Sequence, residues 1–593
     1  MAVPTSTIQP PPSASPSRRP DRVRWAAAGI LIALVIGVTG LATLVLTGSR
    51  NTSVVLGYVP ADSVAYGELR LDLPGDQRQE VGEFLSKFPG FADQAALETK
   101  LDEVLDRLVS QGSGGKQTFT KDVKPWFGGQ LGFALGPIPS GGGDGSTGHD
   151  ARGLMLLTVK DPALARTWLT STLQSEGVTS SSETYNGSEL TIFAAPNSPD
   201  SQAAFTIAGD RVAMVGDVAS VKAAVDTRGS SPLAKGDAVT TAQASLTGDD
   251  LGFMFLDLRA LIEASSEMAG AIGSAAPIPS LPDTISVVMP EWTAVRLRVE
   301  GDALRVDGVS EHPQGLPGPD QNRTNAVAGF APPSTIALLS GNEYGATLLE
   351  WVELYRDEPG LQDTFAQIDQ AAGMLGGLEA LLRWMGDTGV VVARNGEGVE
   401  GGLVTIPADA AQGRQLLTTL RTLLQMGGPD AGVTITDETY NGETITVVDL
   451  GDLSGLMGMA GALGGPALPT APSGLPGGKV QLAYVANDSV IAIGSSADFI
   501  KHVLDAGAGD SLADDARFQG LLARVDAQHS GVSFVDVTAI RGLIEGMMAD
   551  LPAAEKAEYE ESVKPFLTPF DAFISTGSVG GTTDQMHTVI TVK

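Results

Sequence analysis

The sequence predicts an α+β fold, in which one transmembrane helix precedes two tandem homologous units of largely antiparallel sheet with packed helices. Three observations support this prediction. One long apolar run lies near the N-terminus, several blocks of residues recur in the same order farther along the chain, and hairpin signals alternate with amphipathic helical patterns. Hairpins combined with segregated helices are typical of the α+β class.

The composition excludes several classes of protein. The chain has 593 residues, of which 42% are hydrophobic, so it can bury real cores and is not disordered as a whole. It contains no Cys, which excludes disulfides, thiolate metal sites and thiol nucleophiles. Its formal charge of −32 argues against a nucleic-acid partner, because phosphate backbones bind clustered Lys and Arg.

Residues 26–46 are predicted to form the transmembrane helix. These 21 residues carry no charge, and a helix of that length spans about 32 Å, close to the hydrocarbon thickness of a bilayer. Four arginines precede the run and only Arg50 follows it closely. The positive-inside rule therefore predicts a single-pass protein of the cell membrane, with a cytoplasmic N-terminus and an extracytoplasmic bulk. A cleaved signal peptide is the alternative, but its apolar region is only about 7 to 15 residues long and ends in a small-x-small site.

Residues 1–25 are predicted to be a disordered cytoplasmic tail. They are rich in Pro and Ser and too poor in apolar side chains to fold. A polyproline II ligand or a phosphorylation target is an alternative interpretation of this tail.

The rest of the chain is internally repetitive. The block Glu183-Thr-Tyr-Asn-Gly187 recurs 255 residues later, as Glu438-Thr-Tyr-Asn-Gly442. Other blocks recur in the same order: Tyr58–Ala65 as Phe330–Ala337, Gly209–Gly216 as Asn487–Gly494, Lys222…Asp226 as Lys501…Asp505, and Phe255–Asp257 as Phe534–Asp536. This pattern predicts two extracytoplasmic α+β repeat units, at 51–312 and 326–593. The Pro, Gly and polar residues of 313–325 are typical of a linker between them.

Within each unit, short β-type runs alternate with helical patterns. Strands are predicted at 63–71, 131–135 and 154–159. A helix is predicted to begin at Asp161-Pro162, because Asp suits the N-cap and Pro suits the first turn. The Asn-Gly pair in each Glu-Thr-Tyr-Asn-Gly block predicts a hairpin turn. Apolar stripes at helical spacing predict amphipathic helices over 97–108 and 365–382.

Three short motifs follow the apolar N-terminal run: Val59-Pro-Ala-Asp-Ser63, Gly209-Asp-Arg-Val212 and Phe255-Leu-Asp257. With these motifs the chain resembles the bacterial, actinobacterial-type membrane-anchored family catalogued as domain of unknown function 3352. The resemblance extends over about residues 54 to 593, as two divergent copies. It implies a membrane-anchored surface protein and brings no catalytic residues with it.

One glycine motif resembles a nucleotide-binding loop. Gly396-Glu-Gly-Val-Glu-Gly401 fits the pattern G-x-G-x-x-G. A dinucleotide-binding loop is followed by a helix, whose N-terminus holds the pyrophosphate. Here a β-type run at 402–406 follows instead, so we predict a plain hairpin loop.

Two aspartates stand at matching positions after an apolar strand, Asp257 and Asp536. They could form a catalytic acid pair if the fold brought them together. We favour N-caps, because a helical stretch follows each of them.

Other ionisable residues form no recognisable site. The five His are scattered, and the loop 141–150 lacks the oxygen ladder of a tight calcium site, so it is predicted to be a flexible linker. The sequence therefore assigns no catalytic, cofactor-binding or metal-binding residue, and no cofactor.

The predicted partners follow from apolar segments. The bilayer is the partner of residues 26–46. The loops 269–281 and 455–469 are apolar yet rich in Gly and Pro, and an exposed loop of this kind suits a lipid or a protein partner. A loop folded back over its own core is the alternative interpretation.

Taken together, these features predict a non-catalytic binding or scaffolding module at the cell envelope. The alternative is an envelope hydrolase or transferase that depends on carboxylates or a divalent metal. That alternative requires at least two carboxylates within about 4 to 5 Å of each other in a cleft. A third hypothesis is that the tail transmits a signal through the membrane.

Overall fold

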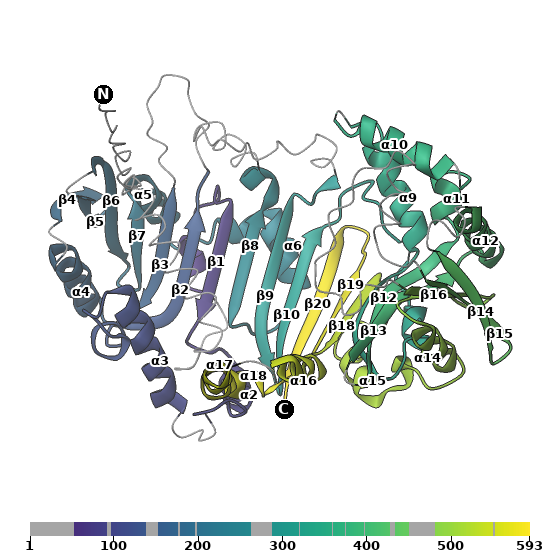
Figure 1. The fold of residues 1–593 in the computed structure, drawn as a ribbon. Helices are drawn as coiled ribbons and strands as arrows, with labels where there is room; N and C mark the ends of the chain where they lie inside the picture. Colours follow the sequence, from purple (N-terminus) through teal and green to yellow (C-terminus); the bar gives the residue numbers. More distant parts are fainter. Residues whose placement is uncertain are drawn as a thin grey trace, which may run out of the picture.

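The computed structural model describes residues 53–91, 97–137, 152–175, 178–195, 198–262, 288–319, 321–358, 360–373, 375–396, 398–426, 433–449, 481–548 and 552–593. Within these ranges, twenty strands form one continuous antiparallel sheet that runs across the molecule (Figure 1). The first ten strands are β1 (Ala65–Arg70), β2 (Phe127–Leu135), β3 (Gly153–Val159), β4 (Thr179–Tyr185), β5 (Ser188–Ala195), β6 (Ser198–Ala208), β7 (Val212–Asp217), β8 (Gly252–Asp257), β9 (Trp292–Glu300) and β10 (Ala303–Glu311). The other ten are β11 (Thr335–Gly341), β12 (Met385–Asn395), β13 (Gly398–Pro407), β14 (Thr434–Tyr440), β15 (Glu443–Asp449), β16 (Gln481–Ala486), β17 (Ile491–Gly494), β18 (Gly531–Asp536), β19 (Phe570–Ser578) and β20 (Thr583–Val592).

The strand order shows how the sheet is assembled. Strands β1–β10 lie in the order β4-β5-β6-β7-β3-β2-β1-β8-β9-β10. Strands β11–β20 lie in the corresponding order, β14-β15-β16-β17-β13-β12-β11-β18-β19-β20. The two halves meet where β10 pairs with β20, from Ala303 opposite Thr591 to Glu311 opposite Thr583. Backbone hydrogen bonding therefore continues across the centre of the molecule.

This architecture corrects the predicted fold class. The sequence predicted two tandem homologous units of largely antiparallel sheet with packed helices, preceded by one transmembrane helix. The strands instead form a single sheet, because β10 and β20 pair with each other and leave no open edge between the halves. The predicted boundaries at 51–312, 313–325 and 326–593 stay predictions.

The predicted single-pass localisation, with an extracytoplasmic bulk, is likewise corrected. None of the helices in the described ranges combines the length and the apolar character that crossing a bilayer requires. The segment 26–46, where the transmembrane helix was predicted, lies outside the described residues, as do the tail 1–25 and the loops 141–150, 269–281 and 455–469.

Helices and short helical turns connect the strands. Those of the first half are η2 (Val55–Tyr58), α2 (Gln77–Leu85), α3 (Leu97–Gly112), η4 (Phe119–Val123), α4 (Pro162–Ser175), α5 (Val218–Thr227), η5 (Leu233–Lys235) and α6 (Asp237–Ser245). Those of the second half are η6 (Ala326–Gly329), α9 (Tyr344–Tyr355), α10 (Gln362–Gly373), α11 (Leu378–Leu382), α12 (Ala410–Met426), α14 (Ala497–Gly507), η8 (Leu512–Asp514), α15 (Ala516–Leu522), α16 (Val537–Met547), α17 (Ala553–Glu558), η10 (Tyr559–Val563) and α18 (Lys564–Leu567).

The two faces of the sheet differ in their chemistry. Because directly opposite residues of an antiparallel pair share a face, the register places Glu68, Phe253, Arg296, Asp307 and His587 in one row on one face. We call this side the charged face. The residues that alternate with them in each strand point to the other side, which we call the apolar face.

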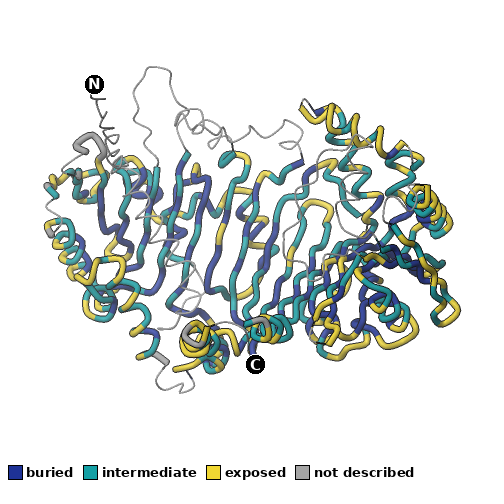
Figure 2. The backbone as a smooth tube through the Cα atoms, viewed as in Figure 1, coloured by how far each residue is buried: buried dark blue, intermediate teal, exposed yellow. Residues whose placement is uncertain are grey.

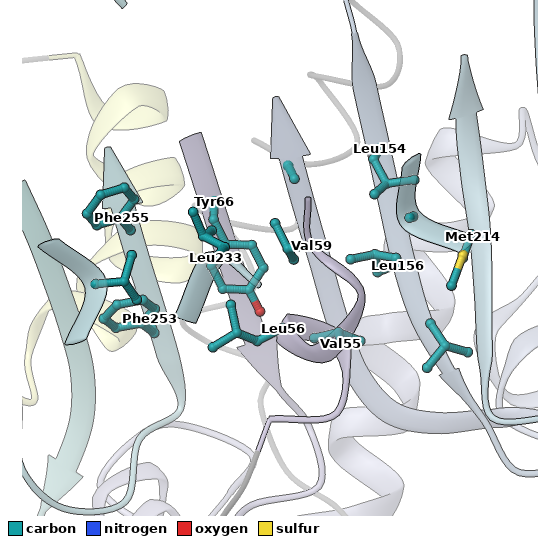
Figure 3. Packing of buried hydrophobic residues seen from close by; sticks show 14 of the residues in the cluster. Val55, Leu56, Val59, Tyr66, Leu154, Leu156, Met214, Leu233, Phe253 and Phe255 are labelled. Atoms are coloured by element: carbon teal, nitrogen blue, oxygen red, sulfur yellow. The ribbon is translucent and has the colours of Figure 1, made fainter. Parts of the chain in front are cut away.

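Helices cover the charged face. In the first half, η2, α5, η5 and α6 pack on a core that contains Tyr66, Phe253 and Phe255 (Figure 3). In the second half, α14 and α15 place Phe499 and Phe518 against the strands. Figure 2 shows buried positions concentrated along the strands and exposed positions on the outer helices and hairpin ends.

The apolar face is covered only in part. Helices α3 and α4 pack at one side around Trp126, and α11 and α12 pack at the other side around Trp384. Helix α2 places Val81, Phe84 and Leu85 against the ends of the central strands. A small apolar pocket lies between α2 and these strands.

Several local predictions are confirmed. The strands predicted at 63–71, 131–135 and 154–159 correspond to β1, β2 and β3, and the stripe over 97–108 lies in α3. Asp161 caps α4, accepting hydrogen bonds from the backbone N–H of Ala163 and Leu164, each at 3.0 Å. The stripe over 365–382 was predicted as one helix, and this is wrong. Gly376 and Gly377 have φ values of 96° and 93°, so the chain leaves the helical region between α10 and α11.

Candidate functional site

The two aspartates singled out by the sequence are helix caps. Asp257 accepts a hydrogen bond from the N–H of Ala260 at 2.9 Å, and Asp536 accepts one from the N–H of Ala539 at 2.8 Å. Asp536 also pairs with Arg517 at 2.7 Å. Their strands, β8 and β18, are five strand spacings apart, or about 24 Å. The N-cap interpretation is confirmed, and the two residues cannot act as a catalytic pair.

The glycine motif at 396–401 is a hairpin, as predicted. Asn395 lies opposite Gly398 in the register of β12 and β13. Since β13 continues directly from the turn, no helix N-terminus faces the glycines and a pyrophosphate has no dipole to bind.

Four of the five histidines fall in the described ranges, and three of them pair with carboxylates. His312 lies 3.0 Å from Asp584, and His502 lies 2.5 Å from Glu400. His587 contacts Asp307, as described below. His529 is buried with its Nδ1 unpartnered, and burial lowers its pKa. In the part of the chain that the structure describes, no group of three His, Asp or Glu is arranged to hold a metal ion.

The main polar feature that sequence reasoning missed is centred on Glu68. This residue lies in β1, is only 7% exposed, and accepts hydrogen bonds at Oε2 from the hydroxyls of Ser53 and Tyr66. Burial, with the charge of Asp250 added to it, raises the pKa of Glu68 from 4.5 to about 7. Burial and the adjacent carboxyl raise the pKa of Tyr66 as well. Glu68 is thus close to half-protonated at neutral pH.

A second group of buried polar side chains adjoins Glu68. Arg70 lies two residues farther along β1, on the same face, and its Nη2 lies 3.0 Å from Asp72 Oδ2. Gln130 of β2 donates to the same oxygen at 2.8 Å. The carboxylate of Asp72 is therefore satisfied by donors from both strands.

The row continues to the junction of the two halves. Asp307 of β10 accepts hydrogen bonds from Arg296 Nη2 at 3.2 Å and from Arg305 Nε at 2.8 Å, and it lies 2.7 Å from His587 Nδ1 on β20. Burial alone opposes ionisation, but the hydrogen bonds from His587 and Arg305 hold the pKa of Asp307 well below its usual range. Nε and Nη1 of Arg296 are buried without a hydrogen-bond partner. The Asp307–His587 contact therefore joins the halves through side chains as well as backbone.

The buried ionisable side chains of this row contact other side chains of the protein. A carboxyl with a pKa of about 7 could transfer protons, but Glu68 is enclosed and both of its contacts come from the protein. Each buried carboxylate of the described residues has a partner: Glu68, Asp72, Asp307, Glu358, Asp387 and Glu400. This arrangement does not favour a carboxylate- or metal-dependent hydrolase.

The repeated sequence blocks meet each other in space. At the tip of the β4–β5 hairpin, Tyr185 and Asn186 donate to Asp226 of α5 at 2.8 and 2.6 Å. At the tip of the β14–β15 hairpin, Tyr440 and Asn441 donate to Asp505 of α14 at 2.8 and 3.2 Å. An ion pair accompanies each contact: Lys222–Glu183 at 2.7 Å and Lys501–Glu438 at 3.0 Å. The repeated residues thus fasten each hairpin to a helix.

The middle of the apolar face carries an exposed apolar patch. Met254, Val295 and Met586 lie in one row across β8, β9 and β20, and Leu339 of β11 lies opposite Val390 of β12. The exposed fractions are 42% for Met254, 43% for Met586, 63% for Leu339 and 48% for Val390. We call these five residues the open apolar patch. It spans the β10–β20 junction.

Comparisons with known proteins identify the chain by family only. No curated protein matches it. Two crystal forms of TP0453 match in the search of solved structures. Form III has a TM-score of 0.21, 9% identity and coverage of 45% of this chain and 82% of that chain. Form IV has a TM-score of 0.22, 10% identity and coverage of 43% and 79%. A family model matches residues 25–590, and the chain belongs to that family, described as "Protein of unknown function (DUF3352)".

Proposed function

We propose that this protein is a non-catalytic binding or scaffolding module that holds a partner against the open apolar patch. The observation that carries the proposal is the distribution of side chains across the central strands. In a sheet with one covered face, apolar side chains normally point to the covered side and charged ones to water. Here the charged row lies beneath helices, while Met254, Leu339, Val390 and Met586 are exposed.

The ionisable groups support binding rather than catalysis. The buried carboxylates have partners within the protein, and Asp257 and Asp536 cap helices. A catalytic carboxylate needs an accessible position beside the reacting atoms. Glu68, whose pKa is raised to about 7, is enclosed by Ser53 and Tyr66.

Native mass spectrometry of the full chain purified from its own host, combined with elemental analysis, tests this proposal. We expect a stoichiometric complex with a protein partner and no stoichiometric divalent metal. A chain that carries a stoichiometric divalent metal and hydrolyses a substrate in its presence would overturn the proposal in favour of the enzyme.

A further inference from the structure

Building on the proposed function, we propose that the open apolar patch is the docking surface for a cationic amphipathic helix of a partner protein. The first step is the composition of the apolar face. Every Asp, Glu, Lys and Arg side chain of β1, β8, β9, β10 and β18 lies on the charged face: Glu68, Arg70, Asp257, Arg296, Arg298, Glu300, Arg305, Asp307, Glu311 and Asp536. On the apolar face these five strands therefore present only apolar and small polar side chains, whereas β20 also carries Asp584 there, opposite Ser310 and two residues from Met586.

The dimensions of the patch suit a protein more than a small ligand. From Met254 on β8 to Val390 on β12 there are seven strand spacings, or about 34 Å. A pocket for a small ligand shields the side chains that line it, whereas Leu339 is 63% exposed. A helix of about 20 residues is 30 Å long, which matches the length of the patch.

The backbone of the sheet determines what kind of element can dock. The central strands are paired on both sides, so a partner cannot add a strand to them. A helix satisfies its own backbone hydrogen bonds and needs only an apolar surface to pack against. Helix α2 already packs this way at the ends of the same strands, with Phe84 and Leu85 buried against them.

Charge selects a basic partner. The chain carries a formal charge of −32, so a second copy would be repelled and a helix with Lys and Arg beside its apolar stripe would be attracted. The methionines Met254 and Met586 fit this role, because their flexible side chains adapt to varied apolar surfaces.

Fluorescence anisotropy with two synthetic helical peptides tests the assignment. Both have about 20 residues and the same Leu stripe; one carries Lys on its polar face and the other carries Glu. The receptor is the full chain, either unchanged, with the double substitution Leu339→Gln and Met586→Gln, or with Leu164→Gln. Leu164 is a matched control, because it is 47% exposed but lies on α4, away from the patch.

We expect the Lys peptide to bind at least about tenfold more tightly than the Glu peptide. The double substitution should weaken binding of the Lys peptide about tenfold, whereas Leu164→Gln should leave it unchanged. Equal binding of the Lys peptide to the unchanged chain and the double variant overturns the docking site, and equal binding of the two peptides overturns the basic partner. A dimer in sedimentation that the double substitution dissociates would assign the patch to a second copy. Each of these results leaves the proposed binding function standing, since that function is judged by the native complex and its metal content.

Discussion

Glu68 holds its proton more tightly in the folded protein than a carboxyl in water does. Its pKa rises from 4.5 to about 7, mainly because burial penalises the ionised form. Between these two values the folded state binds more protons than the unfolded state, so the free energy of unfolding decreases as the pH rises from 4.5 to about 7, and this contribution is constant above that. A shift of this size corresponds to about 3 kcal/mol.

The substitution Glu68→Gln should remove this pH dependence. Urea unfolding is measured at pH 5 and pH 8 for the unchanged chain and for the variant, and the difference in unfolding free energy between the two proteins should change by about 2.5 kcal/mol. Both proteins contain His529, so its contribution cancels in this comparison. The lowered pKa of His529 makes the fold less stable as the pH falls below 6.5, whereas the Glu68 effect makes it less stable as the pH rises. Glu353→Gln is the control, because Glu353 is 81% exposed. A difference in unfolding free energy that is the same at both pH values would contradict the raised pKa of Glu68.

Asp307 is a second residue whose removal should be costly. It accepts hydrogen bonds from Arg296 and Arg305 and contacts His587. In Asp307→Asn these cationic groups lose their buried counter-charge, and we expect a loss of about 3 to 5 kcal/mol in urea unfolding at pH 7. Asp369→Asn, which removes the half-exposed partner of Arg356, should have only a small effect. Equal effects of the two substitutions would count against a buried charge network at the junction.

At the scale of single elements, the turns and caps could be predicted because their causes are local. Asn441 and Gly442 have φ values of 50° and 87°, and Asn-Gly is the dipeptide that tolerates this conformation. The caps at Asp257 and Asp536 likewise depend only on the residues that follow them. In contrast, the charged face could not be predicted, because a Glu or Arg that alternates with apolar residues normally indicates the solvent side of a strand.

Two glycine substitutions should change the stability of the fold in opposite directions. Gly442→Ala meets no neighbouring atom but forces a side chain into the left-handed region, so it should destabilise by about 1 kcal/mol. Gly520→Ala also meets no atom, but Gly520 lies within α15, where Ala is favoured, so it should stabilise by about 0.5 to 1 kcal/mol. Thermal unfolding of both variants checks this. A stabilising Gly442→Ala would contradict the tight turn.

The contact between each hairpin and its helix should control local opening. The sequence showed both repeated blocks but not that they meet, since Tyr440 and Asp505 are 65 residues apart. Tyr440→Phe removes the hydroxyl that donates to Asp505 and leaves the ring in place. In this variant, hydrogen exchange in β14 and β15 should become faster while exchange in β18 stays unchanged. In Tyr185→Phe, exchange in β4 and β5 should become faster. Unchanged exchange in both hairpins would show that the contact does not hold them.

At the scale of the whole molecule, the pairing of β10 with β20 is the feature that the sequence could not reveal. His587 follows Asp307 by 280 residues, and two open strand edges carry no residue pattern that says whether they pair with each other. The linker composition of 313–325 instead suggested separation. The composition of the apolar face was equally hidden, because exposure of Met586 and Leu339 depends on which helices cover which side.

A single sheet predicts that the two halves unfold together. Hydrogen exchange in low denaturant should give β8 and β18 the same opening free energy, since each is linked to the other through β9, β10, β20 and β19. Val306→Pro removes a backbone N–H that lies between β10 and β20. It should therefore lower the opening free energies of β8 and β18 and make them differ from each other. Thr434→Pro, at the first residue of the edge strand β14, should leave the shared opening intact. If β8 and β18 already open independently in the unchanged chain, the continuous sheet does not act as one cooperative unit, and the Asp307–His587 junction is not what couples its halves.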